Sequence, residues 1–163
     1  MVDSLLPRGN LVIYLTILLA MILQVFPLPD WAIQLRPQWP LIVLIYWSML
    51  FPNRVGIFTA MIVGLFVDVM LDSLLGQHVL AYAMAIYIVI TTHKRLSLMH
   101  VWQQALAVFL LLLIERIIMA IVLGMTRGQT TDIHFWLPPL IGMLLWPLLG
   151  LLFRNFNRKL RLG

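Results

Sequence analysis

The sequence of 163 residues lacks cysteine, and only 10% of its residues are charged. The absence of cysteine excludes disulfide bonds and metal sites built on thiolates. The shortage of charge excludes an ordinary soluble domain, in which about one residue in four is charged. No polar stretch is long enough to fold separately, so residues 1–163 are predicted to form one domain.

Motifs for several kinds of chemistry are also absent. The sequence has no His-Glu-x-x-His zinc motif, no glycine-rich phosphate loop and no Gly-x-Ser-x-Gly elbow. Asp68 and Asp72 share one apolar segment, whereas an aspartyl protease needs acids on two segments facing one water. The histidines fall at segment ends or in loops and are interpreted as interfacial polar residues: His78, His93, His100 and His134. We therefore predict no catalytic residue, no cofactor, no metal site and no binding of nucleic acid.

Hydrophobic residues make up 63% of the sequence and gather in six long segments, as in an integral membrane protein. The predicted fold is all-α, with transmembrane helices at approximately 11–26, 38–51, 55–75, 79–92, 101–123 and 135–153. The second segment is short, so residues 31–35 are expected to complete its crossing, and a five-span arrangement with a re-entrant second segment is the alternative. Three prolines predict that the last span is kinked or begins late: Pro138, Pro139 and Pro147.

The basic residues indicate an orientation. With six spans, eight of them fall on one side of the membrane: Arg8, Arg54, Lys94, Arg95, Arg154, Arg158, Lys159 and Arg161. The other side carries Arg36 and Arg127. Because basic loops stay in the cytoplasm, both termini are predicted to be cytoplasmic. The basic tail, from Arg154 to Arg161, is expected to anchor to anionic lipid headgroups, with docking of a cytoplasmic protein as the alternative.

The third segment, 55–75, is predicted to be the central helix. Small residues and acids recur every four positions along it and therefore share one face: Gly56, Ala60, Gly64, Asp68 and Asp72. Small residues let a neighbouring helix approach closely, and carboxylates at membrane depth need a partner. This stripe is therefore predicted to face protein, either another helix of the chain or a partner protein. Asp72 lies one turn beyond Asp68 and is expected to reach headgroups or water.

The fifth segment contains two further charges, Glu115 and Arg116. Asp68 and Arg116 lie at similar heights in the predicted spans, so we predict an ion pair between them. Neighbouring residues on a helix face different ways, so Glu115 needs another partner, such as Gln24 or Arg36, or else is protonated. These charges either specify helix packing, form a proton or ion pathway, or contact another membrane protein.

A series of short motifs resembles the MreD family of rod shape-determining proteins of Gram-negative bacteria. The motifs are Arg36-Pro37-Gln38-Trp39, Tyr46-Trp47, Pro52-Asn53-Arg54-Val55, Gly64 with Asp68, Leu75-Gly76, and Trp102-Gln103-Gln104-Ala105-Leu106. Their order and spacing cover nearly the whole chain. The matching positions are interpreted as structural or partner-contact residues: Arg36, Trp39, Arg54, Gly64, Asp68 and Gly76.

The resemblance implies a non-enzymatic inner-membrane scaffold of the machinery that builds the lateral cell wall. It implies MreC as the partner, with MreB filaments, the RodA glycosyltransferase and its transpeptidase partner in the larger complex. The family is also similar in fold to the S-components of energy-coupling-factor vitamin transporters. A transport subunit that binds a small molecule is therefore the alternative function, with a pocket expected near Arg36, Trp39 and Asp72.

Overall fold

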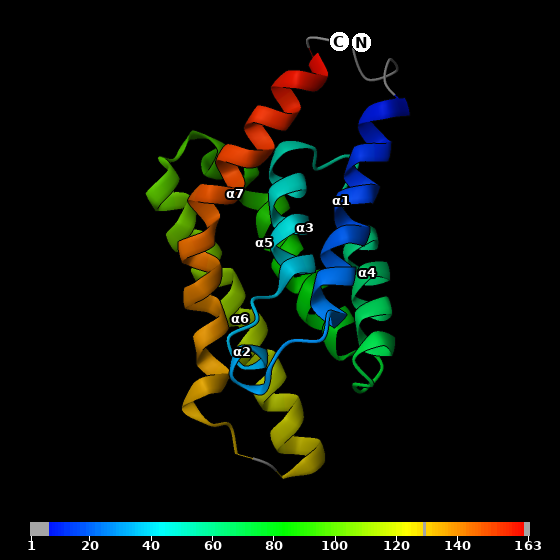
Figure 1. Ribbon diagram of the computed structural model, residues 1–163, viewed down its shortest axis with the longest axis vertical. Helices are drawn as coiled ribbons and strands as arrows, with labels where there is room; N and C mark the ends of the chain where they lie inside the picture. The colour runs from blue at the N-terminus through cyan, green and yellow to red at the C-terminus, as the bar shows by residue number, and fades with distance from the viewer. Residues whose placement is uncertain (1–6, 129, 162–163) are drawn as a thin grey trace.

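The computed structural model describes the backbone of residues 7–128 and 130–161 and the side chains of residues 9–128, 130–155 and 158. Over these residues the fold is entirely helical, as predicted. The elements are, in chain order, α1 (Pro7–Val25), α2 (Asp30–Ile33), α3 (Trp39–Leu50), α4 (Ile57–Met70), α5 (Gln77–Leu98), α6 (Val101–Arg127), the 3-10 helix η1 (Ile133–Trp136) and α7 (Leu137–Arg161). Figure 1 shows the longer helices running alternately down and up in one bundle.

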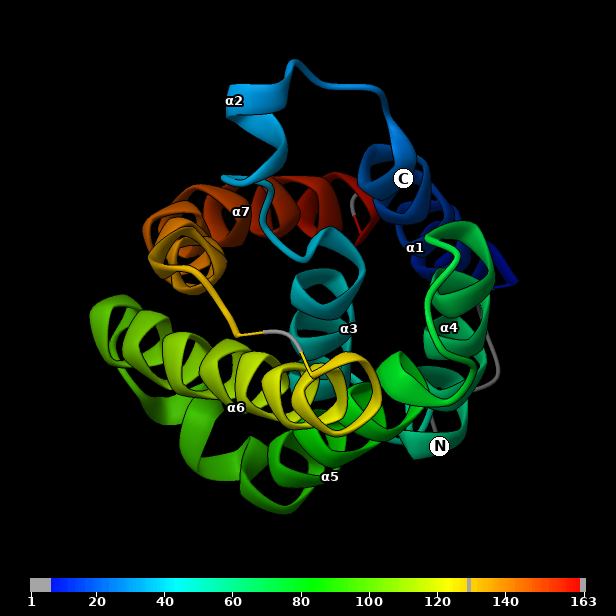
Figure 2. The same cartoon turned by 90° about the horizontal axis from the view of Figure 1, so that it is seen from below.

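The centre of the bundle is α3. Ten of its 12 residues are buried, and it contacts α1, α4, α5, α6 and α7. Figure 2 shows α3 in the middle of these helices when the bundle is viewed from one end. A helix that is apolar on every side is stable where every side is covered. The prediction that the segment 55–75 forms the central helix is therefore wrong, and the short segment before it takes that place.

In contrast, α4 lies at the periphery and packs mainly on α5. The prediction that its small residues face protein is confirmed, because Ala60, Gly64 and Asp68 are buried. A Cβ added to Gly64 would lie 2.8 Å from backbone atoms of His78 and Val79, so α5 covers the stripe directly. The chain's own helix, and not a partner protein, therefore occupies this face.

The ends of the predicted stripe lie outside the helix. Gly56 is the N-cap residue of α4, and the helix ends at Met70. Asp72 is exposed and sits in the turn after α4, with a positive φ of 51°. Asp72 does not share the buried face, because the backbone leaves the helix before reaching it, and its exposed side chain agrees with the expectation that it reaches headgroups or water.

Only some of the predicted spans form helices that are both long and apolar enough to cross a membrane. Among the described residues, Val101–Arg127 and Ile133–Asn155 are long and apolar enough to span a membrane. Three further apolar helices are shorter: Gly9–Val25, Trp39–Leu50 and Ile57–Met70. The predicted completion of the second crossing is not found, because α2 has no buried residue and stands apart from α3 (Figure 2). The fourth and fifth segments form longer helices than predicted, since α5 continues to Leu98 and α6 to Arg127.

The prolines shape the last helix as predicted. Residues Ile133–Trp136 form η1, and α7 starts only at Leu137, with Pro138 and Pro139 in its first turn. Proline is tolerated there because the first amides of a helix have no partner within it. Pro147 lies inside α7 and removes one backbone hydrogen bond. Figures 1 and 2 both show α7 changing direction part-way along its length.

Aromatic side chains join α3 to the first and last helices. Tyr46 stacks on Phe153 of α7 with ring centroids 4.6 Å apart, and Trp146 lies 6.1 Å from Tyr46. Trp47 donates its Nε1–H to Thr16 of α1 at 2.9 Å. The central helix is therefore held on both sides by specific contacts as well as by apolar packing.

The two groups of basic residues lie at opposite ends of the bundle. Figure 1 shows that α1 begins and α7 ends at one end, near the α3–α4 turn and the α5–α6 junction. This end, called the basic end, carries Arg54, Lys94, Arg95, Arg154 and Arg158. The opposite end holds α2, the α4–α5 turn and the connection from α6 to η1. Arg8, Lys159 and Arg161 belong to the predicted basic group, but their side chains lie outside the described residues.

Candidate functional site

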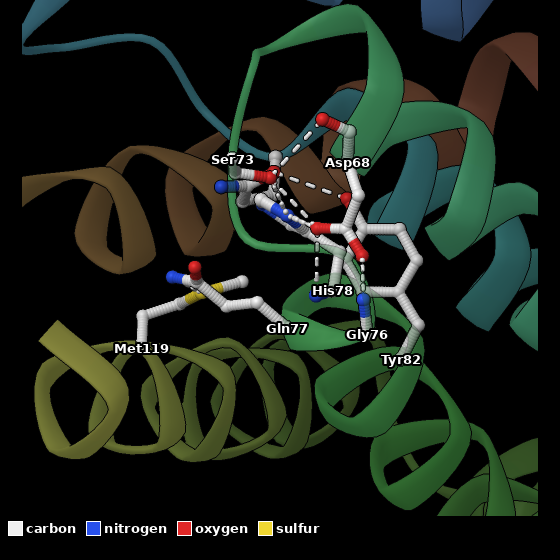
Figure 3. A network of polar contacts seen from close by, with 8 residues as sticks. Asp68, Ser73, Gly76, Gln77, His78, Tyr82 and Met119 are labelled. Carbon is white, nitrogen blue, oxygen red and sulfur yellow. Dashed lines mark hydrogen bonds and ion pairs between the residues drawn. The ribbon is translucent and has the colours of Figure 1, made fainter. Parts of the chain in front are cut away.

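The most highly connected polar side chain of the described residues is the carboxylate of Asp68, near the end of α4 (Figure 3). Its Oδ1 accepts the Ser73 hydroxyl at 2.8 Å, the His78 Nδ1–H at 2.7 Å and the His78 backbone N–H at 3.0 Å. Its Oδ2 accepts the backbone N–H of Gly76 at 2.9 Å. Asp68 is fully buried, and these bonds replace the water that the carboxylate loses.

The turn between α4 and α5 brings these donors to Asp68. Gly76 has a φ of 99°, in the left-handed region that glycine adopts without strain, and it is the N-cap residue of α5. This conformation folds the start of α5 back over the end of α4. The first amides of a helix have no partner inside it and carry partial positive charge, so they suit a carboxylate. Asp68 therefore closes the helical hairpin formed by α4 and α5.

The trio of Ser73, His78 and Asp68 does not have the geometry of a Ser-His-Asp nucleophile. In such a triad the serine bonds one ring nitrogen of the histidine and the aspartate bonds the other. Here Asp68 and Ser73 both lie on the Nδ1 side of His78, and the Ser73 hydroxyl already donates to Asp68. The arrangement serves to hold a turn together and leaves no activated hydroxyl.

Glu115 and Arg116 form a second charged group, in the middle of α6. Glu115 is fully buried, and its Oε2 lies 3.4 Å from the Nε of Arg116. Within the described residues neither oxygen of Glu115 has a hydrogen-bond partner. The guanidinium of Arg116 lies over the ring of Phe135, 4.9 Å from its centroid.

The predicted ion pair between Asp68 and Arg116 is therefore wrong. The bonds of Asp68 go to the α4–α5 turn, and the acidic neighbour of Arg116 is Glu115. Among the described residues Glu115 lies beside Arg116 and makes no hydrogen bond with Gln24 or Arg36, because long side chains on adjacent positions can bend towards each other. The alternative that Glu115 is protonated stays a prediction. The ion-pair prediction took both spans to be straight and level, whereas α4 is short and ends just beyond Asp68.

Further polar contacts link α5 to its neighbours. Tyr82, fully buried on α5, donates its hydroxyl to Oε1 of Gln38 at 3.1 Å, just before α3. The Gln77 side-chain amide donates to the sulfur of Met119 on α6 at 2.7 Å (Figure 3). The polar groups near the opposite end are therefore spread over α3, α5 and α6 and hold these helices in register.

Two of the predicted partner-contact residues close the connection between α1 and α3. Arg36 donates to the backbone carbonyls of Gln24 and Phe26, at the end of α1. The backbone N–H of Trp39 donates to Oε1 of Gln24 at 3.3 Å. Both residues are partly exposed, so they have a structural role and also reach the surface.

The other predicted contact residues differ in their surroundings. Gly76 is fixed in the Asp68 turn, and Arg54 lies over the ring of Phe51, 5.5 Å from its centroid. Arg154 and Arg158 are exposed near the end of α7, as expected for a basic tail. Lys159 and Arg161 continue this helix, but their side chains lie outside the described residues.

A pocket of about 500 Å³ lies beside these polar groups at the opposite end. Its lining comes from α1, the α1–α3 connection, α5, α6 and the η1 region, and includes Arg36, His78, Arg116 and Asp132. The pocket expected near Arg36, Trp39 and Asp72 is found in part, because Arg36 lines this pocket whereas Trp39 and Asp72 do not, although their neighbours Gln38 and Leu71 do.

Sequence reasoning missed His78 and Ser73 as partners of Asp68. His78 was interpreted as an interfacial residue because it directly precedes an apolar run. A local signal identifies His78 as a partner of Asp68. Gly76 predicts a left-handed turn, and the helix that starts directly after this turn offers its free amides to an acid at the end of the preceding helix.

The match to a known family is decided by the whole sequence. The model of the family described as rod shape-determining protein MreD matches residues 8–156. The chain belongs to the MreD family. The rod shape-determining protein MreD of Haemophilus influenzae is 33% identical over 147 residues, which cover 88% of this chain and 89% of that protein. The resemblance in the sequence motifs is thereby confirmed.

Family membership assigns the chain a role in the determination of rod shape. Its long apolar helices and its large exposed apolar surface are those of a membrane protein. No solved structure matches the chain. The likeness to the S-components of vitamin transporters therefore stays a prediction.

Proposed function

We propose that this chain is a non-enzymatic scaffold in the bacterial inner membrane that binds MreC and helps to position the peptidoglycan synthases of the lateral wall. The observation that carries the proposal is the family match over residues 8–156. MreB, RodA and its transpeptidase partner join the same complex in this proposal. The Asp68 cluster supports a scaffold, because its bonds fix the packing of two helices and leave no reactive group.

In this proposal the chain crosses the membrane six times, through α1, α3, α4, α5, α6 and α7, with both termini in the cytoplasm. The concentration of arginine and lysine at the basic end supports this orientation. Anionic lipids bind the exposed Arg154 and Arg158 at that end.

We assign the contact with MreC to the outer face of α4. The face that carries Gly64 is already covered by α5, so it is not open to a partner. On the outer face Phe58, Val69 and Phe66 are 75%, 64% and 55% exposed. With 14 residues, α4 is about 21 Å long, which is shorter than the ~30 Å hydrocarbon core. A helix of a partner against this face reduces the mismatch between α4 and the lipid.

Disulfide crosslinking tests this contact. The chain has no cysteine, so Phe58→Cys or Phe66→Cys introduces a single thiol, which is paired with single cysteines along the membrane span of MreC. Leu110→Cys on α6 and Leu144→Cys on α7 are matched controls, 51% and 70% exposed. We expect crosslinks from the two α4 positions and none from the controls. Crosslinks confined to α6 or α7 would move the interface away from α4.

The role in cell shape has a separate test. Cells depleted of this chain are expected to become round, and the wild-type gene is expected to restore rods. An α4 variant that no longer crosslinks to MreC, such as Phe66→Lys, is expected to reach the membrane but to leave the cells round. Restoration of rods by that variant would show that the α4 face is not needed for function.

A further inference from the structure

The pocket at the opposite end does not include the outer face of α4 or the Asp68 carboxylate, although His78, the partner of Asp68, lines it. Its volume of about 500 Å³ lies in the range typical of small-molecule sites, about 300–1,000 Å³. Most of the residues that line it are polar, including four glutamines, His78 of α5, and Thr131 and His134 from the connection between α6 and α7. These side chains offer hydrogen-bond partners to a polar ligand.

Two arginines point to the sign of that ligand. The pocket is lined by Arg36 and Arg116, and by one acid, Asp132. Arg36 donates to two backbone carbonyls and to no carboxylate among the described residues, so its charge is not neutralised by a neighbour. Glu115, the acidic neighbour of Arg116, is fully buried and does not line the pocket.

Arg36 also has unused hydrogen-bonding capacity. Its Nε atom is buried and has no hydrogen-bond partner in the described part of the chain, whereas the Nε of Arg116 faces Glu115 at 3.4 Å. Buried donors are nearly always paired with protein, water or a ligand. Guanidinium groups bind carboxylate and phosphate oxygens through two parallel hydrogen bonds.

Helix termini of both polarities line the pocket. Gln38, Gln77 and Pro138 lie at helix starts, whereas Gln24, Gln34 and Leu71 lie at helix ends. Helix starts carry partial positive charge and helix ends partial negative charge, so the backbone contributions oppose each other. The sign of the pocket therefore depends on its arginine side chains.

We propose that this pocket binds an anionic group, a phosphate or carboxylate, with Arg36 and Arg116 as its ligands. The group belongs either to a soluble small molecule or to the headgroup of a lipid at that membrane surface. This site goes beyond the scaffold role, which does not require it.

Charge-selective labelling tests the proposal in the full chain, purified and placed in phosphatidylcholine vesicles. Thr131→Cys places the sole thiol in the pocket lining, and Ile133→Cys, 78% exposed and outside the lining, places it on the other side of Asp132. The reaction rates of anionic and cationic methanethiosulfonate reagents are compared at each position. Because a charged cleft concentrates counter-ions by about tenfold or more, we expect the anion-to-cation rate ratio to be about tenfold higher at 131 than at 133. Equal ratios at the two positions would overturn the proposal.

Variants of the arginines assign the effect. Arg36→Gln, or the paired change Glu115→Gln with Arg116→Gln, is expected to lower the ratio at 131 to that at 133. Arg127→Gln, at the same end but outside the lining, is expected to leave it unchanged. A ratio that survives both pocket variants contradicts the assignment to these arginines.

Competition distinguishes the two sources of the anion. Inorganic phosphate that slows labelling at 131, compared with potassium chloride of equal ionic strength, indicates a soluble ligand. Slower labelling in phosphatidylglycerol than in phosphatidylcholine vesicles, without phosphate, indicates a lipid headgroup. If neither condition slows labelling at 131, the pocket does not bind an anion and the proposal fails.

Discussion

His78 donates its Nδ1–H to the carboxylate of Asp68 at 2.7 Å, and both side chains are almost completely buried. The two residues come from different helices. The backbone N–H of His78 donates to the same carboxylate, and the turn between the helices adds the N–H of Gly76 and the hydroxyl of Ser73. The pair therefore stabilises the packing of the end of α4 against the start of α5.

Loss of the Asp68 charge is expected to destabilise the protein. Asp68→Asn replaces an acceptor-only group with one that presents a hydrogen-bond donor to other donors, and losing a hydrogen bond to a charged group costs about 1.5–3 kcal/mol. The free energy of unfolding, measured by SDS titration in mixed micelles, checks this. His78→Phe combined with Asp68→Asn is expected to cost less than the sum of the two single changes, by about 0.5–3 kcal/mol. Asp72→Asn, in the exposed turn, is the control and is expected to leave the stability unchanged.

Gly64 and Gly124 are expected to respond in opposite ways to alanine. At Gly64 the added Cβ meets the backbone of α5 at 2.8 Å, so the helices must separate, which costs about 1–3 kcal/mol. At Gly124, in α6, the Cβ meets no atom within 4 Å. There alanine is expected to stabilise the helix by about 0.5–1 kcal/mol. Thermal unfolding midpoints of the two variants in detergent are the measurement, and equal shifts would contradict the close α4–α5 contact.

Glu115 and Arg116 are expected to behave as a coupled pair. Glu115→Gln or Arg116→Gln alone leaves one buried charge without its partner, at a cost of about 3–5 kcal/mol. The double change removes both charges and is expected to recover much of that loss. A double-mutant cycle by SDS titration measures the coupling. If the losses simply add, the two side chains do not stabilise each other.

The bond between Trp47 and Thr16 is expected to hold α1 against the bundle. Thr16→Val keeps the shape but removes the acceptor of the buried indole N–H, at a cost of about 1–3 kcal/mol. Thr126→Val is the matched control, because in the described part of the chain the hydroxyl of Thr126 bonds only to the carbonyl of Val122 within its own helix. Differential scanning fluorimetry in detergent compares the two. A larger loss at 126 than at 16 would contradict a structural role for the Trp47 contact.

The helical class and the positions of the apolar segments could be predicted because long apolar runs with short polar turns permit few other structures. The late start of α7 was also predictable, since Pro138 and Pro139 are incompatible with a helix that begins earlier. The choice of the central helix was not. Lipid tails are as apolar as a protein interior, so a helix enclosed by protein and one exposed to lipid have similar sequences. In α3 and α4 the compositions therefore do not distinguish the buried helix from the peripheral one.

The candidate site was only partly predictable for a related reason. The buried position of Asp68 and its need for a partner followed from the cost of a carboxylate at membrane depth. Its actual partners depend on where α4 ends and on the left-handed turn at Gly76. These two features make His78, and not Arg116, the partner of Asp68. A difference of a few residues in the end of a helix changes which side chains meet.

The enclosed position of α3 sets an order for biosynthesis. Four of the five helices that contact it, α4, α5, α6 and α7, are synthesised later, so only α1 among its neighbours exists when α3 leaves the ribosome. The partners of Tyr46 on α7, Trp146 and Phe153, are among the last residues to be made. Until they arrive, this 12-residue segment is too short to anchor itself stably in a bilayer, and a nascent chain stopped after α6 exposes it to the insertion and quality-control machinery of the cell.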